Sequence, residues 1–201
     1  LKKMKNILAI ETSSEACSLA LGLGRKEKFL HEVNQHKHTE RLLGLIENLM
    51  QDQRLNFKEL HAIAVGHGPG SFTGVRLACA VAQGLSYSSD IPVIKVSSLE
   101  IMAEHFHKKY QAQEVVILIN AHMNQIYMGR FYYKDQLVSS SEVGIPIQEF
   151  TPNDFGDNTY FAGDGCGLVK EKLNKYHQKV YKHYPNALDL LAIARKKLDK
   201  G

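Results

Sequence analysis

Short apolar runs and longer amphipathic stretches alternate along the chain, and their spacing predicts the secondary structure. Runs that are rich in strand-forming side chains and bounded by polar or glycine-containing turns are typical of β-strands. They occur at residues 6–10, 17–23, 26–33, 62–65, 92–96, 114–121, 126–133, 136–143 and 159–162. Apolar side chains at helical spacing predict helices at residues 39–50, 75–85, 98–110, 168–173 and 186–195.

The order of these elements recurs. Each half begins with strands joined by short turns, which suggests an antiparallel meander, and continues with further strands and helices. A meander extended by parallel strands with crossover helices makes a mixed sheet that helices cover. The pattern therefore predicts an α/β fold with two lobes, an N-terminal lobe over residues 4–100 and a C-terminal lobe over residues 101–201.

Composition places the chain among ordinary globular proteins. Of its 201 residues, 44% are hydrophobic and 23% are charged, which argues against disordered, collagenous and membrane classes. No apolar run reaches the roughly 18–20 residues of a bilayer span, and the N-terminus lacks the features of a secretory signal. Cys17, Cys79 and Cys166 are far apart, which fits a reducing compartment. We therefore expect a cytoplasmic protein with no membrane partner.

Charge is unevenly distributed along the chain. The formal net charge is +4, and from Cys166 onward nine Lys or Arg residues stand against three Asp or Glu residues. A basic region can bind phosphates, but a lysine-rich helix face in solvent gives the same pattern. Both interpretations of the C-terminal region stay open.

Two segments offer groups that could bind a phosphate. A polar turn follows the first strand, where a carboxylate and hydroxyls could hold a metal-bound phosphate or only satisfy the local backbone. A glycine-rich loop at residues 66–74 precedes a helix, where backbone N–H groups favour an anion, although glycines also permit close packing. The candidates for a weak, degenerate nucleotide cleft are Glu11, Thr12, Ser13, Gly68, Gly70, Ser71 and Gly74.

The glycine-rich loop matches none of the common phosphate or nucleophile motifs. A Walker loop needs Lys-Ser/Thr after its last glycine, and here Val75 follows Gly74. G-x-G-x-x-G fails because the next glycine after Gly68 and Gly70 is Gly74, and G-x-S-x-G does not fit around Ser71. The loop therefore predicts no specific chemistry by itself.

Histidine gives no clear metal site either. His36 with His38 and His105 with His107 are H-x-H pairs, whose members share a face only in a strand. No H-E-x-x-H occurs, and no cysteine joins either pair. No carboxylate pair has a spacing that marks acid–base catalysis. From the residues we predict neither a metal site nor catalytic residues.

Several segments resemble the bacterial TsaB (YeaZ) family. They are I-L-A-I-E-T-S-S-E-A-C-S at residues 7–18, H-T-E-R-L-L at residues 38–43 and G-H-G-P-G-S-F-T-G-V-R-L at residues 66–77. A-Q-G-L at residues 82–85 and V-S-S-L at residues 96–99 continue the match. The resemblance is specific from residue 6 to about residue 104, and the later half matches more loosely.

This resemblance implies both a fold and a function. The family has the two-lobed fold of actin, sugar kinases and Hsp70, and it belongs to the machinery that puts a threonylcarbamoyl group on adenosine 37 of tRNAs decoding codons that begin with A. It implies a non-catalytic scaffold or activating subunit that binds the catalytic paralogue TsaD, with the ATPase TsaE and with tRNA through the complex. The alternatives are a nucleotide-binding phosphotransferase or ATPase of the actin-like fold and, third, a metallopeptidase (glycoprotease).

Some positions depart from what catalytic relatives carry. The metal-binding H-x-x-x-H pair of the paralogue does not occur here, and Glu11 stands where nucleotide-binding relatives usually have Asp. Asn120 and His122 stand where the family often has Asp and Arg. The resemblance thus implies no metal and at most weak ATP or ADP binding. The chain also stops at Gly201, earlier than family members usually do, so either the chain is truncated or this branch of the family is short, and both interpretations of the C-terminal lobe stay open.

Two helical segments carry the expected partner interface. Residues 39–50 have more apolar surface than one core face needs, and residues 72–85 have small side chains that allow close helix approach. In the family, helices at these places pair TsaB with TsaD and can self-pair, so we expect a heterodimer, with a homodimer as the alternative. The interface candidates are Leu42, Leu45, Ile46, Leu49, Phe72, Arg76, Ala78, Val81, Ala82 and Leu85. The opposite interpretation is that both helices are wholly core.

Overall fold

The structure, a computed structural model, describes residues 5–33, 38–175 and 179–200. The chain divides into two compact units, which we call unit 1 (Leu1–Ser98 with Pro185–Gly201) and unit 2 (Leu99–Tyr184). The first boundary lies close to the one predicted at residue 100. The prediction that residues 101–201 form one lobe is wrong for its last segment, because Pro185–Gly201 belongs to unit 1.

Unit 1 is built on a five-stranded mixed sheet in the order β3-β2-β1-β4-β5. Its strands are β1 (Asn6–Glu11), β2 (Ala16–Leu23), β3 (Lys26–Val33), β4 (Ala62–Gly66) and β5 (Val93–Val96). The first three form the predicted antiparallel meander, and β4 and β5 add to it in parallel. Ile10 of β1 pairs with Val65 of β4, so the carboxyl ends of these two strands lie side by side.

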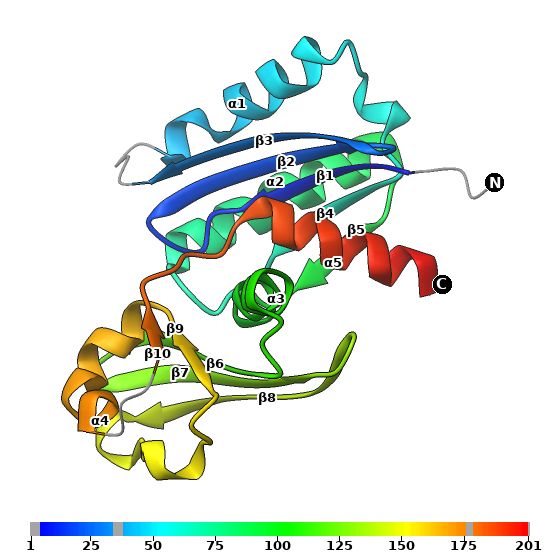
Figure 1. The fold of residues 1–201 in the computed structure, drawn as a ribbon. Helices are drawn as coiled ribbons and strands as arrows, with labels where there is room; N and C mark the ends of the chain where they lie inside the picture. The colour runs from blue at the N-terminus through cyan, green and yellow to red at the C-terminus, as the bar shows by residue number, and fades with distance from the viewer. Residues whose placement is uncertain (1–4, 34–37, 176–178, 201) are drawn as a thin grey trace. The chain divides into compact units, whose positions relative to one another are not determined.

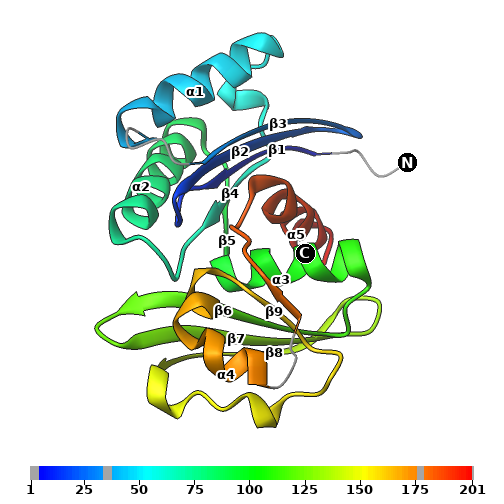
Figure 2. The same ribbon diagram turned by 60° about the vertical axis from the view of Figure 1, so that its left-hand side comes forward.

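Helices cover both faces of this sheet (Figures 1 and 2). Side chains alternate along β1, and Leu8 and Ile10 enter the core beneath α1 (His38–Asp52) and α2 (Phe72–Ser89). The other face meets α5 (Ala187–Lys200), whose Leu191 packs against the backbone of β2. Asn186 caps α5, because its Oδ1 accepts the backbone N–H of Asp189 at 3.0 Å.

Unit 2 contains a second five-stranded sheet, in the order β10-β9-β6-β7-β8. Its strands are β6 (Glu114–His122), β7 (Gln125–Tyr133), β8 (Leu137–Pro146), β9 (Tyr160–Ala162) and β10 (Lys179–Tyr181). α3 (Ser98–Tyr110) packs on one face through Met102 and Phe106. The opposite face packs against Cys166, Val169 and Leu173, which precede or lie in α4 (Lys170–Lys175).

The two sheets have the same topology, which confirms the predicted α/β fold with a mixed sheet in each lobe. β9 and β10 extend the β6–β8 meander in parallel, as β4 and β5 extend the β1–β3 meander. The helix that follows each repeat belongs to the other unit, however. α3 follows β5 but lies in unit 2, and α5 follows β10 but lies in unit 1.

A few predicted boundaries differ from the structure. α2 begins at Phe72 rather than at residue 75, because the Ser71 side chain caps it by accepting the N–H of Gly74. Residues 164–169 form a 3-10 helix ahead of α4. The sequence did not predict β10, which has three residues. Among the described residues, no helix combines the length and apolar character needed to cross a membrane.

Candidate functional site

The residues predicted to form a degenerate nucleotide cleft lie together in unit 1. The parallel pairing of β1 with β4 places Glu11 beside Gly66, and the turn after β1 contacts the glycine-rich loop that follows β4. Ser98, at the start of α3, closes the group through its N–H, which donates to the carbonyl of Gly68 at 2.8 Å. We call this group the glycine junction: Glu11, Thr12, Ser13, Gly68, Gly70, Ser71, Gly74 and Ser98.

Glu11 is fully buried in the glycine junction. Its Oε1 accepts the backbone N–H of Ser13 at 2.6 Å, and its Oε2 accepts the hydroxyl of Ser98 at 3.3 Å. A Cβ at Gly66 would overlap the carboxyl group, so glycine is needed there. Burial raises the pKa of Glu11, and hydrogen bonds from Ser13 and Ser98 offset part of this rise. The carboxyl group therefore points into the protein.

The loop glycines allow backbone segments to approach closely. A Cβ at Gly70 would overlap the carbonyl oxygen of Ser13, and a Cβ at Gly74 would overlap that of Thr12. The Thr12 hydroxyl donates to the carbonyl of Gly74 at 2.8 Å, and the N–H of Ser71 donates to that of Ser13 at 2.7 Å. Bulkier residues would force these segments apart.

Three backbone N–H donors of the glycine junction are already in use. The N–H of Ser13 binds Glu11, that of Ser71 binds Ser13, and that of Gly74 binds the Ser71 hydroxyl at 3.4 Å. The Glu11 carboxyl, when ionised, would also repel an anion. These contacts favour the structural interpretation of the loop, and nucleotide binding by these residues stays a prediction.

The partner-interface candidates separate into core and surface residues. Five of them are buried in the hydrophobic core of unit 1, namely Leu42, Ile46, Ala78, Val81 and Ala82, and their part in a partner interface stays a prediction. Three leucines are half-buried against the same core, namely Leu45, Leu49 and Leu85. Phe72 and Arg76 are exposed. The spacing of apolar residues could not separate buried from exposed positions in α2, because this helix is apolar on nearly all sides.

α2 nevertheless presents a largely uncharged outer face. The helix has 18 residues, and its buried side chains are Ala78, Val81 and Ala82. On the opposite side lie the residues that we call the α2 outer face: Phe72, Arg76, Ala80, Gln83, Gly84 and Tyr87. Phe72 is 73% exposed and Tyr87 is 93% exposed. The Arg76 guanidinium, the only charge on α2, lies 5.0 Å from the Phe72 ring centroid.

α1 adds further exposed groups to unit 1. Leu43 is 56% exposed, and a Cβ at Gly44 would meet open space. Sequence reasoning missed both Leu43 and Tyr87, although helical periodicity relative to the buried positions would have placed them outward. The surface residues, and not the whole apolar stripes, are therefore the candidate docking groups.

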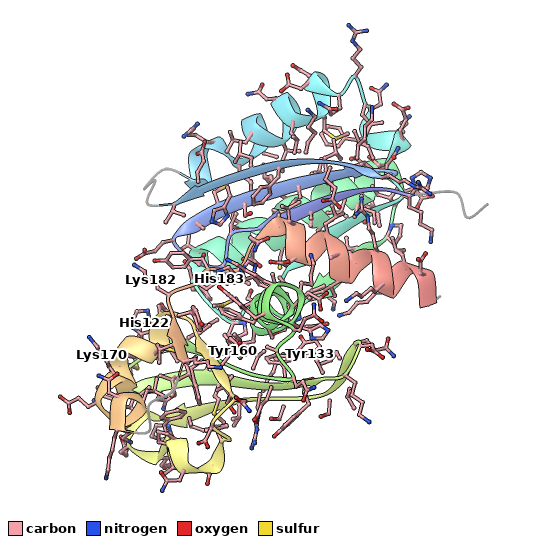
Figure 3. All side chains as sticks on the ribbon, viewed as in Figure 1. His122, Tyr133, Tyr160, Lys170, Lys182 and His183 are labelled. Atoms are coloured by element: carbon pink, nitrogen blue, oxygen red, sulfur yellow. The ribbon has the colours of Figure 1, made fainter. Side chains whose placement is uncertain are left out.

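The turn between β6 and β7 is held by hydrogen bonds from backbone N–H groups to side-chain oxygens. His122 donates its N–H to Asn120 Oδ1 at 2.8 Å, and the N–H of Asn120 donates to Asp164 Oδ1 at 3.1 Å. His122, labelled in Figure 3, has a φ of 60°. The nearby carboxylate thus comes from Asp164, in the glycine-containing turn after β9, and it holds the turn in place.

The histidine pair of α3 divides between two environments within unit 2. His107 is buried, stacks on Tyr133 with ring centroids 4.2 Å apart, and has its Nδ1 3.0 Å from the carbonyl oxygen of Ala112. His105 stacks instead on His183, with centroids 4.0 Å apart. His36 and the side chain of His38 lie outside the described residues.

Comparisons with known proteins show clear relatives. The family model described as tRNA N6-adenosine threonylcarbamoyltransferase (TsaD) matches residues 29–144. The tRNA threonylcarbamoyladenosine biosynthesis protein TsaB of Haemophilus influenzae is 34% identical over 94% of this chain and 84% of its own length. That of Buchnera aphidicola subsp. Schizaphis graminum is 31% identical over 92% and 90%. The structure of YeaZ from Pseudomonas aeruginosa aligns with TM-score 0.86 and 33% identity, covering 98% of this chain and 94% of that chain.

Proposed function

We propose that this chain, which belongs to the TsaB (YeaZ) family and takes part in tRNA threonylcarbamoyladenosine biosynthesis, is a non-catalytic scaffold subunit. In this role it binds and supports a TsaD-like catalytic relative. A TsaE-like ATPase joins them, and tRNA is bound through the complex.

The observation that carries the proposal is the α2 outer face. An aromatic side chain buries roughly 150–250 Å² when it is covered, and Phe72 and Tyr87 leave most of that surface in solvent. Gly84 lets a neighbouring helix approach, because nothing lies within 4 Å of the position of its missing Cβ. A long helix with one charge and two exposed aromatic rings has the composition of an interface core.

We choose this partner because the chain is related in sequence to the TsaD family. The TsaD family model matches this chain over residues 29–144, which include α1 and α2. A TsaD-like relative would then offer a helix pair built on the same sheet topology, and two apolar helix pairs pack against each other by interlocking their ridges and grooves. A second copy of this chain offers the same surface, so self-pairing is the competing arrangement.

The lack of catalysis is inferred from the glycine junction. Three of its N–H donors bind protein acceptors, and its carboxyl group is fully buried. We infer that the chain holds no nucleotide or metal as a resident cofactor. Turnover of ATP with Mg²⁺ by the isolated chain would favour the phosphotransferase alternative, and bound zinc or iron on elemental analysis would favour the metallopeptidase.

Charge placed on the α2 outer face tests the docking surface. We expect Tyr87→Glu to weaken binding of the TsaD-like relative at least about tenfold, because burying an unpaired carboxylate costs several kcal/mol. Binding is measured by size-exclusion chromatography and titration calorimetry. Because Tyr87 is 93% exposed, the variant should fold, which circular dichroism checks.

The matched control is Val138→Glu, at a side chain that is 61% exposed on β8. It adds the same charge on unit 2 and should bind like the parent. A folded Tyr87→Glu variant with parental affinity would rule out the α2 outer face. Loss of a homodimer with unchanged binding of the relative would assign the face to self-pairing instead.

A further inference from the structure

We propose that unit 2 carries an RNA-binding surface, made of tyrosines and lysines at the end of α3 and along β9 and β10, through which this chain contacts tRNA. We call it the Tyr–Lys surface: Lys109, Tyr110, Tyr160, Lys179, Tyr181, Lys182 and Tyr184. The inference rests on the proposed function, since it names where on this chain the tRNA of the complex is bound.

Tyrosine rings from three separate elements gather on this surface. The rings of Tyr110 and Tyr160 have centroids 5.5 Å apart and planes 22° apart, and those of Tyr160 and Tyr181 are 5.9 Å and 20° apart. Tyr110 and Tyr181 complete the group at 5.6 Å. Tyr110, at the end of α3, is 37% exposed. Two of these ring pairs are stacked and the third is tilted by 34°, and together they form what we call the aromatic platform.

Lysines lie over two of these rings and over Tyr184. Lys179 Nζ is 5.0 Å from the Tyr160 ring centroid, as expected from the pairing of these two residues between β10 and β9. Lys109 Nζ is 5.2 Å from the Tyr110 ring centroid. Lys182 lies over Tyr184 at 5.6 Å. Figure 3 labels Tyr160, Lys182 and His183 on β9 and on the segment after β10.

The two chain segments that supply most of the surface are basic. Residues 105–113 and 179–188 contain four lysines and no Asp or Glu. The lysines of the pairs, Lys109, Lys179 and Lys182, are all exposed. This surface accounts for part of the C-terminal basic excess and joins it to Lys109, which is distant in sequence.

RNA is the partner that uses both features. Lysines neutralise phosphates and release counterions, and aromatic rings stack on unpaired bases. A tRNA offers both a phosphate backbone and unpaired loop bases. An acidic protein segment would contact the lysines but would gain little from the tyrosine rings.

Removing the two lysines that cap the tyrosines tests this surface. The full chain, alone and with the TsaD-like relative, is titrated with unmodified tRNA transcript by fluorescence anisotropy between about 50 and 200 mM salt. We expect Lys109→Gln with Lys179→Gln to bind several-fold more weakly at low salt. The slope of log affinity against log salt should fall by about one to two, since two phosphate contacts are lost.

A second variant separates stacking from charge. Tyr160 and Tyr181 also pack against the core of unit 2, so the more exposed Tyr110 is changed to Leu. Tyr110→Leu should weaken tRNA binding about fivefold or more with an unchanged salt slope, because a stacking ring is lost without loss of charge. The charge-matched control, Lys28→Gln with Lys58→Gln, alters exposed lysines of unit 1 and should bind like the parent.

The inference is overturned if the double lysine variant binds like this control, or if neither the parent chain nor its complex binds tRNA in a salt-dependent way. It is also overturned if polyglutamate displaces tRNA as well as single-stranded RNA does, since the surface then recognises charge alone. Failure of the proposed function has a different signature, namely a chain that does not co-elute with the TsaD-like relative whatever its affinity for tRNA.

Discussion

Glu11 was a candidate for binding a metal-bound phosphate, but its buried contacts favour a structural role. Its carboxyl group ends the first strand, packs against Gly66 and accepts hydrogen bonds from Ser13 and Ser98. The group ties the end of β1 to the start of α3. A buried carboxyl that makes such contacts stabilises the fold most when it is protonated, because burial disfavours its charged form.

Replacing Glu11 by Gln should change how stability depends on pH. Burial raises the folded-state pKa of Glu11 above the ordinary 4.5, so the folded protein binds the proton more tightly than the unfolded chain. This contribution is fully present below that ordinary value and is lost as pH rises through the folded-state pKa. As pH rises, the free energy of unfolding of the parent should therefore fall relative to that of Glu11→Gln, by about 1.4 kcal/mol for each unit by which the folded-state pKa is raised.

Urea denaturation of both proteins at acidic and mildly alkaline pH measures this difference. Glu47→Gln, at an exposed position of α1, controls for loss of a carboxylate at the surface. A stability difference between parent and Glu11→Gln that does not change with pH would contradict the burial of an ionisable group at this position.

At the scale of one element, α2 contains glycines with opposite requirements. Gly74, in its first turn, contacts the backbone of Thr12, whereas Gly84 faces open space on the α2 outer face. The first is needed for close packing within unit 1. The second lowers helix stability and leaves room above the helix, which is consistent with a surface kept free for a partner.

The two glycines should respond oppositely to alanine. Gly84→Ala should raise the free energy of unfolding by up to about 1 kcal/mol, because alanine is the better helix former and meets no neighbour. Gly74→Ala should lower it by about 2 kcal/mol or more, since its Cβ overlaps the Thr12 carbonyl. Thermal and urea denaturation compare the two variants, and equal effects would contradict the packing described for α2.

For the whole molecule, the main feature is that each repeat supplies a helix to the other unit. α5 comes last in the chain but covers the face of the first sheet that α1 and α2 leave open. Arg195 of α5 also forms an ion pair with Glu27 of β3. The first unit is thus completed only by the last segment of the chain.

Truncating a buried side chain of α5 should therefore weaken unit 1. Leu191 is fully buried, and Leu191→Ala should cost about 2–5 kcal/mol through lost packing and a residual cavity. Hydrogen exchange should show reduced protection in β1, next to α5, with β6 less affected. Lys196→Ala, at an exposed position of the same helix, is the control. Parental protection of β1 in Leu191→Ala would contradict the placement of α5.

Much of the fold was predictable because local patterns carry it. Alternating and helical periodicities located the elements, and Asn186 marked the start of α5 correctly. The α2 outer face was not predictable, since a helix that is apolar all round does not reveal which side the sheet covers. The Tyr–Lys surface was hidden because its residues are brought together by α3, β9 and β10, which are far apart in sequence.

Motifs and periodicity were enough to predict the family, the order of strands and helices, and the repeat of one topology, because both are local properties of a chain. Three features could be read only from the folded structure: Glu11 is buried, Ala78 and Val81 are core while Phe72 and Tyr87 are surface, and the last helix belongs with the first sheet. These features depend on which distant segments pack together, and burial is a property of that packing.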